Sequence, residues 1–306
     1  MMQRVASIVD LKYAHDRKIY GQGINVCVVD SGIAPHKDLM NNKGRRLIAS
    51  YDTVNGLSDF YDDSGHGTHV AGIIGAGGTA FRGMAPECGL ISVKVLKDDG
   101  GGKMADVIRG LEWILQNWKK YNIRIVNISV GAGSEKYDNN SDIVKIVENL
   151  WDLGLVVIVA AGNRGPGQST VSIPGTSRKI ITVGASDDDI RVYSHRMSMQ
   201  HYSGRGPTAE CIMKPDIVAP GSGILSLSMT KKMSRYAIKS GTSMATPVVS
   251  GAVALLLSKY PELSNRDVKI RLKNTVLDLS LPHEKQGWGL VNVKTLLEGK
   301  RGSQTV

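Results

Sequence analysis

Aromatic residues and cysteine are scarce in this chain of 306 residues, which contains only two Phe and three Cys. Cys27, Cys88 and Cys211 are odd in number and far apart, so they form no disulfide framework and lack metal-ligand spacing. No apolar run approaches the length of about 18 residues that a membrane-spanning helix needs. Residues 1–20 carry charges throughout and lack the apolar segment of a signal peptide. We therefore expect a globular cytoplasmic protein, or a secreted one only if the chain is a fragment of a longer precursor.

Acidic residues are fewer than basic ones, 28 against 38, which gives a net charge of +10. The basic residues are scattered, with short pairs at 45–46, 119–120, 231–232 and 300–301. A nucleic-acid site usually shows a longer basic patch or interleaved aromatic residues. The charge therefore indicates a solvated surface, and we expect neither nucleic acid nor a membrane as a partner.

Strand-like apolar runs alternate with stretches of helical periodicity. The predicted strands are 24–29, 89–96, 123–130, 155–161 and 180–183, and the predicted helices between them include 104–121 and 141–153. Continuous Val and Ile runs are typical of parallel strands that are covered on both faces. The pattern predicts an α/β fold with a doubly wound, mostly parallel central sheet and helices on both faces. Residues 187–206 are polar and are expected to form a surface excursion.

Three short segments place polar residues where chemistry is common. Residues 28–32, V-V-D-S-G, end the first strand and put Asp30 at its carboxyl edge, where open α/β sheets build their sites. Residues 63–72, D-S-G-H-G-T-H-V-A-G, put His66 at the start of a helix. Residues 240–247, S-G-T-S-M-A-T-P, put Ser243 at the start of another, which continues through residue 259. Each residue alone is more typical of a turn or helix cap than of a catalytic site.

Together, the three segments resemble those of the subtilisin-like serine proteases, which share the chain order Asp, His, Ser. The resemblance covers about residues 21–297, and further segments similar to the family lie at 94–96, 129–131, 160–163 and 214–221. It implies one peptidase domain at 21–297, an N-terminal arm at 1–20 and a flexible C-terminal tail at 298–306. It also implies a serine endopeptidase that forms an acyl-enzyme and needs no cofactor or metal for catalysis.

The resemblance assigns four chemical roles. Ser243 would be the nucleophile, His66 its general base and Asp30 the group that orients the imidazole. The Asn163 side chain and the Ser243 backbone N–H would form the oxyanion hole.

The resemblance also implies the residues that bind an extended peptide. Those that would line two substrate-pairing strands are Gly100, Gly101, Gly102, Ser129, Val130 and Gly131. Met104 and Val107 match a pocket four residues upstream of the cut, although helix packing explains them equally well. The residue just before the cut would enter a pocket with Ala160 and Gly162 in its walls and Ser172 near its base, which favours a large apolar side chain. Arg164 at its rim would disfavour Lys and Arg and tolerate Glu, unless it points to solvent.

A structural calcium site of the family would use Asp38 and the loop 73–82. That loop contains no Asp or Asn and includes Arg82, so we expect the tight site to be absent or weak. Alternatives remain open: a dedicated precursor-processing protease, a transpeptidase, or an inactive protease scaffold that acts as a basic binding protein. The sequence indicates protein or peptide substrates and leaves the oligomeric state unknown.

Overall fold

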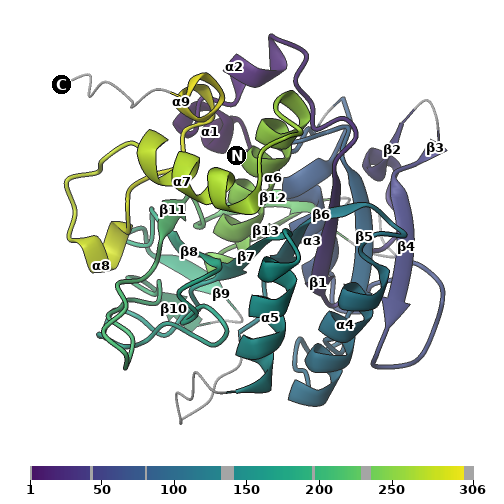
Figure 1. Ribbon diagram of the computed structural model, residues 1–306, viewed down its shortest axis with the longest axis horizontal. Helices are drawn as coiled ribbons and strands as arrows, with labels where there is room; N and C mark the ends of the chain where they lie inside the picture. The colour runs from purple at the N-terminus through teal and green to yellow at the C-terminus, as the bar shows by residue number, and fades with distance from the viewer. Residues whose placement is uncertain are drawn as a thin grey trace.

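Val- and Ile-rich strands form the centre of the molecule. The computed structural model describes residues 2–41, 44–79, 81–131, 141–194, 197–228 and 236–299. Seven strands in these ranges form one sheet of order β11-β8-β7-β6-β1-β5-β4, in which every neighbouring pair is parallel (Figure 1). They are β1 (Asn25–Asp30), β4 (Leu47–Asp52), β5 (Gly89–Lys94), β6 (Ile123–Ile128), β7 (Val156–Ala160), β8 (Ile181–Ala185) and β11 (Ile217–Ala219).

Strand β1 is the point from which the sheet is wound in two directions. Its neighbours β5 and β6 lie on opposite sides of it, and the chain crosses from one to the other through a helix. Asp30, the last residue of β1, pairs in register with Lys94 at the end of β5. Since open α/β sheets bind ligands at the carboxyl ends of strands near such a switch, this edge is where a site is expected.

Helices cover both faces of the sheet. The helices of the described ranges are α1 (Met2–Ile8), α2 (Lys12–His15), α3 (His66–Gly75), α4 (Met104–Asn117), α5 (Asp142–Asp152), α6 (Thr242–Lys259), α7 (Asn265–Thr275), α8 (His283–Gln286) and α9 (Val293–Glu298), with a 3-10 turn, η1 (Lys37–Leu39). Helices α4 and α5 pack together on one face, and α3 and α6 pack together on the other (Figure 1). Val107, Leu111 and Ile114 recur at helical spacing and bury the inner side of α4.

Six short strands form three antiparallel pairs outside the main sheet: β2 (Met40–Asn41) with β3 (Gly44–Arg45), β9 (Val192–Ser194) with β10 (Met197–Met199), and β12 (Ile224–Leu227) with β13 (Tyr236–Lys239). The pair β9–β10 lies in the predicted surface excursion 187–206. That segment is anchored at both ends, because Asp188 and Tyr202 are buried.

The predicted fold class is confirmed, and all five predicted strands occur within two residues of their expected starts. Helix α4 ends at Asn117, four residues before the predicted end, whereas α5 closely matches its prediction. Gly154 ends α5 with a φ of 93°, a left-handed conformation that glycine adopts without steric cost. Strands β4 and β11 were not predicted as members of the sheet.

The segment before residue 21 packs against the core. Val5, Val9, Leu11 and Ala14 are buried in it. The backbone N–H of Val293 in α9 donates to the carbonyl of Val9 at 2.7 Å, so the first and last helices meet. The tail predicted at 298–306 begins inside α9 and its cap, Gly299; residues 300–306 lie outside the described ranges.

Helix α6 is the central helix of the core. Within the described residues it is the one helix long and apolar enough to cross a membrane, with a mean hydropathy of 1.2. In this fold 83% of that segment is buried inside the protein, where it contacts β6, β7 and β8. A helix buried in a protein core can be as apolar as a helix that spans a membrane. Packing inside the protein therefore explains the apolar composition of α6.

Candidate active site

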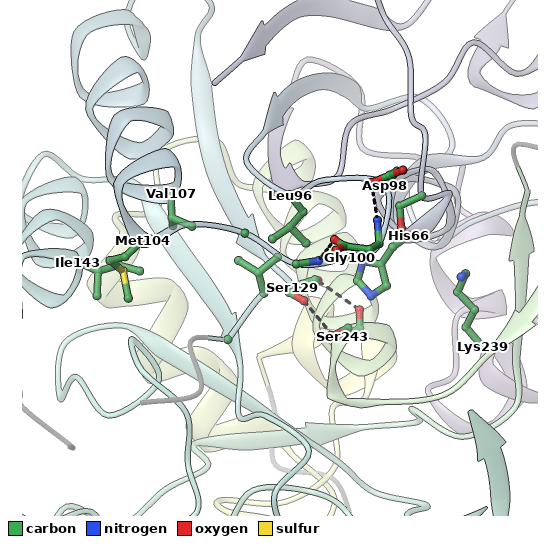
Figure 2. Close-up of a pocket in the computed structure, with 16 residues that line it drawn as sticks. His66, Leu96, Asp98, Gly100, Met104, Val107, Ser129, Ile143, Lys239 and Ser243 are labelled. Carbon is green, nitrogen blue, oxygen red and sulfur yellow. Dashed lines mark hydrogen bonds between the residues drawn. The ribbon is translucent and has the colours of Figure 1, made fainter. Parts of the chain in front are cut away.

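A cleft of about 670 Å³ opens at the carboxyl ends of β1, β5 and β6. Most of the predicted site residues line it: His66, Gly100, Gly101, Gly102, Met104, Val107, Ser129, Val130, Gly131 and Ser243 (Figure 2). These residues come from segments that lie far apart in the sequence; His66 and Ser243, for example, are separated by 177 positions. The fold therefore brings together what the sequence places far apart.

Asp30 and His66 are directly hydrogen-bonded. Nδ1 of His66 lies 2.7 Å from Oδ1 of Asp30, and the backbone N–H of Ser31 donates to the same oxygen at 2.7 Å. Asp30 is fully buried, while the His66 side chain is 25% exposed. Burial alone would lower the pKa of His66, but the Asp30 carboxylate outweighs it and the pKa lies above its ordinary value. The pair holds the imidazole in one orientation with Nε2 left for another partner.

A buried carboxylate that sequence reasoning missed fixes the start of α3. Asp62 accepts hydrogen bonds from the backbone N–H groups of Ser64, Gly65 and Thr68, from the Thr68 hydroxyl and from the Ser31 hydroxyl. Gly65 makes the turn into the helix with a φ of 77°. Asp62 lies three residues before the N-cap, Gly65, so the usual capping pattern gives no signal for this role. Asp62 thereby ties the His66 helix to the residue after Asp30.

The Ser243 hydroxyl points to a backbone carbonyl. Its Oγ donates to the carbonyl of Ser129 at 2.8 Å, and no hydrogen bond joins it to His66 within the described residues. Ser243 follows Gly241, whose φ of 142° makes the turn that starts α6. The residue is half-buried and faces the cleft together with His66 (Figure 2).

Asn163 lies beside the N-terminus of α6. Its Oδ1 accepts from the backbone N–H of Thr242 at 2.9 Å and from the Thr242 hydroxyl at 3.0 Å. These two bonds orient the side chain so that its NH₂ group is left to donate elsewhere. The Ser243 backbone N–H, in the first turn of α6, also lacks a partner among the described residues. Asn163 itself is not among the residues that line the cleft.

An apolar subsite forms at the far end of the cleft from Ser243. Val107 is 8% exposed and belongs to the inner side of α4, whereas Met104 is 38% exposed at its first turn. Ile143, which was not predicted, lines the same end, and Leu96, also not predicted, lies between Val107 and His66 (Figure 2). Val107 therefore packs mainly in the core, and Met104 is the more accessible of the two predicted residues.

The residues predicted to hold the side chain before the cut lie close together. A Cβ added to Gly162 would lie 2.1 Å from Oγ of Ser172, and one added to Gly131 would lie 3.0 Å from its Cβ. Ala160 is buried at the end of β7. Arg164 is exposed and makes no hydrogen bond or ion pair with any described residue. Of this group, only Gly131 is part of the cleft lining described above.

Four polar residues of the cleft lining were not predicted: Ser64, Asp98, Asp99 and Lys239. Lys94 was noted only as family-like text, yet its ammonium is buried next to the site. It donates to the carbonyls of Ser31 and Leu96 and pairs with Asp63 at 2.5 Å. These bonds connect the ends of β1 and β5 to the segment before His66.

The surroundings of Asp38 do not fit a calcium site. The guanidinium of Arg46, which is 5% exposed, donates to the carbonyls of Asp38, Gly75 and Cys88. The Asp38 carboxylate accepts from the Tyr236 hydroxyl at 2.8 Å. A positive side chain thus already binds the carbonyl of Gly75 in the loop 73–82 and that of Asp38 beside it. Residue 80 of the loop lies outside the described ranges. No cluster of three or more metal-ligating side chains occurs in the part of the chain that the structure describes.

Comparison with known proteins identifies the family. Residues 21–289 match the model of the subtilase family. Serine protease AprX of Bacillus subtilis (strain 168) is 44% identical over 278 residues, which cover 83% of this chain and 61% of that protein. Subtilisin BL of Lederbergia lenta is 37% identical over 290 residues, which cover 94% of this chain and 96% of that protein. A thermostable alkaline protease of Halalkalibacterium halodurans is 35% identical, with 94% and 71% covered. The chain spans less than two thirds of AprX but nearly all of Subtilisin BL, and it belongs to the subtilase family of serine endopeptidases.

Proposed function

We propose that this chain hydrolyses internal peptide bonds of proteins and peptides through an acyl-enzyme on Ser243. The observation that carries the proposal is the 2.7 Å bond between His66 and a fully buried Asp30, in a cleft that Ser243 also lines. A buried carboxylate behind an imidazole, with a serine in front, is the arrangement that activates a hydroxyl nucleophile.

The first chemical step requires a rotation of the Ser243 side chain. Its hydroxyl leaves the Ser129 carbonyl and donates to Nε2 of His66, which is the free ring nitrogen because Nδ1 faces Asp30. His66 takes the proton as Oγ attacks the substrate carbonyl, and the Asp30 carboxylate stabilises the imidazolium that forms. The negative oxygen of the tetrahedral intermediate would accept from the Asn163 NH₂ group and the Ser243 backbone N–H.

The second half of the reaction reverses the proton path. His66 gives its proton to the leaving amine, and the C–N bond breaks to leave an ester on Ser243. Water then attacks the ester, again with His66 as the base, which releases the acid and restores the serine hydroxyl. The chain's own residues suffice for these steps, so no cofactor or metal is assigned to them.

The residue before the cut is proposed to be large and apolar. Gly131 and Gly162, which lie around Ser172, are small and uncharged. Burial of a Leu, Phe or Tyr side chain contributes about 1.5–3 kcal/mol, which exceeds the effect of one exposed charge at the rim.

A fluorophosphonate probe tests the nucleophile directly. We expect stoichiometric labelling of Ser243 in the full chain, with loss of both label and proteolysis in Ser243→Ala. The circular dichroism spectrum of the variant should be unchanged, because the hydroxyl makes one hydrogen bond to a backbone carbonyl. Proteolysis by Ser243→Ala at a comparable rate would overturn the mechanism.

A further inference from the structure

A single Lys or Arg side chain occurs among the described residues that line the cleft: Lys239, the last residue of β13. In Figure 2 it lies on the opposite side of His66 and Ser243 from Met104 and Val107. The sequence resemblance assigns those two residues to the end of the cleft that receives the upstream part of a substrate. A peptide that passes Met104 and then reaches Ser243 therefore continues towards Lys239.

Among the residues that the structure describes, none competes for the Lys239 ammonium. It forms no ion pair or hydrogen bond with any residue in the described ranges, and the side chain is only half-buried. Its charge nevertheless reaches the reacting group. Burial is the main cause that lowers the pKa of His69 to about 3, and the charge of Lys239 adds to it. The same charge opposes the rise of the His66 pKa that Asp30 causes.

The opposite wall of the cleft carries negative charge. Asp98 and Asp99 are exposed and line the cleft on the side of the substrate-pairing glycines. Lys97 and Lys103 flank them in the sequence but do not line the cleft. In Figure 2 Asp98 lies beside His66, so an acidic side chain of the substrate is attracted only where it lies nearer to Lys239 than to Asp98.

We propose that Lys239 is a specificity-determining residue that binds an Asp or Glu side chain at one of the two positions following the scissile bond. The inference rests on the proposed function in taking Ser243 as the place of the cut, and on the family resemblance in taking the Met104 end of the cleft as upstream. The half-buried Lys239 ammonium has no counter-charge among the described residues, so it gains an ion-pair partner when an acidic substrate binds. Binding of a neutral substrate costs the ammonium little, because it breaks no ion pair with a described residue.

Matched peptides test the proposal. Each has the same apolar upstream half and carries Glu, Gln or Lys at the first or the second position after the cut, with the cut confirmed by mass spectrometry. For wild type we expect kcat/KM to be about two- to fivefold higher with Glu than with Gln at one of these positions, and lowest with Lys. About 0.5 M salt should reduce the preference, because an exposed pair is screened.

Three variants assign the preference to the residue. In Lys239→Met the ratio of Glu to Gln should fall to about one, and in Lys239→Glu it should fall below one. Lys97→Met removes the same charge from a position that adjoins Asp98 in the sequence but does not line the cleft. This variant should keep the wild-type ratio of Glu to Gln. Because the ratio of Glu to Gln is taken within each variant, a general loss of activity in that variant does not affect it.

Two outcomes would overturn the proposal: a wild-type ratio of one at both positions, or a wild-type preference that survives in Lys239→Met. A p-nitroanilide with the same upstream half and no amino acid after the cut separates these from a failure of the proposed function. If wild type hydrolyses neither the anilide nor any peptide, the proposed activity itself is wrong.

Discussion

Ser129 and Ser243 hold each other by two reciprocal hydrogen bonds. The Ser243 hydroxyl donates to the Ser129 carbonyl at 2.8 Å, and the Ser129 hydroxyl donates to the Ser243 carbonyl at 3.2 Å. Ser129 follows β6 and Ser243 opens α6, so the pair joins the sheet to the helix that carries the nucleophile. In this state the Ser243 hydroxyl is bonded to the segment after β6 and not to His66. The proposed mechanism therefore requires the hydroxyl to break this bond before it can donate to His66.

Substitution of the three reacting residues should have unequal effects. We expect Ser243→Ala and His66→Ala to lose nearly all proteolysis, and Asp30→Asn to lose somewhat less, because His66 retains partial function without its orienting carboxylate. Initial rates on a neutral apolar peptide measure this, and thermal unfolding checks that each variant is folded. Equal and small losses in all three would contradict the assigned roles.

Asn163→Leu should lower kcat by about 10²–10³ and change KM little, as loss of one oxyanion donor does in subtilisin. The Asn163 side chain also accepts from Thr242, so the variant needs a structural control. Asn163→Asp keeps that acceptor and removes the NH₂ donors, and it should show a similar loss in kcat. Recovery of most activity in Asn163→Asp would mean that Asn163 only anchors Thr242.

The pH dependence of kcat/KM should follow the free imidazole of His66. Burial opposes the charged form, but Asp30 raises the pKa above the ordinary 6.5, with a smaller contribution of the same sign from Asp62 and an opposing one from Lys239. Because only the neutral ring can accept the Ser243 proton, activity should rise with pH through a midpoint above 6.5. In Asp30→Asn the midpoint should move to lower pH, and in Lys239→Met to higher pH. A midpoint below 6.5 in wild type would contradict the Asp30–His66 interaction.

Chelation should leave the protein's stability unchanged, because Arg46 supplies the positive charge in the loop near Asp38. We expect no fall in melting temperature beyond a few degrees in EDTA. Arg46→Met should destabilise the fold by about 2–4 kcal/mol, since it leaves the carbonyls of Asp38, Gly75 and Cys88 without their buried donor. Arg178→Met, at an exposed arginine, is the matched control. A loss of tens of degrees in EDTA would show that a tight structural calcium exists.

Cleavage should follow apolar residues in preference to charged ones. On peptides that differ only at the residue before the cut, kcat/KM should be higher for Leu than for Lys in wild type. Arg164→Glu should raise the ratio of Lys to Glu by a factor of up to about five. Preference for Lys over Leu in wild type would sink the assignment of this pocket, and an unchanged Lys-to-Glu ratio would show that Arg164 points to solvent.

The sheet could be predicted where burial on both faces left continuous runs of Val and Ile, as in β1, β5, β6 and β7. Strand β4 escaped because it lies at the edge of the sheet, where its burial alternates and its sequence, L-I-A-S-Y-D, includes polar residues. Strand β11 has only three residues, too few to show a period. Local pattern therefore predicts the centre of a parallel sheet better than its borders.

The candidate site could be predicted where the chemistry lies within short motifs. The motifs predicted Asp30 at the carboxyl end of a strand and His66 and Ser243 at the starts of helices, and the structure has them at these positions. Contacts between distant segments gave no such signal. Arg46 reaches Gly75 across 29 positions, and Lys239 shares a cleft with His66 only because β13 folds back beside it. Neither the partners of a long side chain nor its direction follow from its neighbours in the sequence.

The junction of the two chain ends has a consequence for the order of events during synthesis. Asn292 donates to Asp10 across 282 positions, and α9 also closes on Val9. The two segments of this junction are made roughly 280 positions apart, so α1 and α2 are synthesised well before α9. Until α9 is in place, Val5 and Val9 lack part of the core that covers them in the finished molecule. Their final packing thus depends on a contact of long sequence separation, which is the kind that forms slowly during folding.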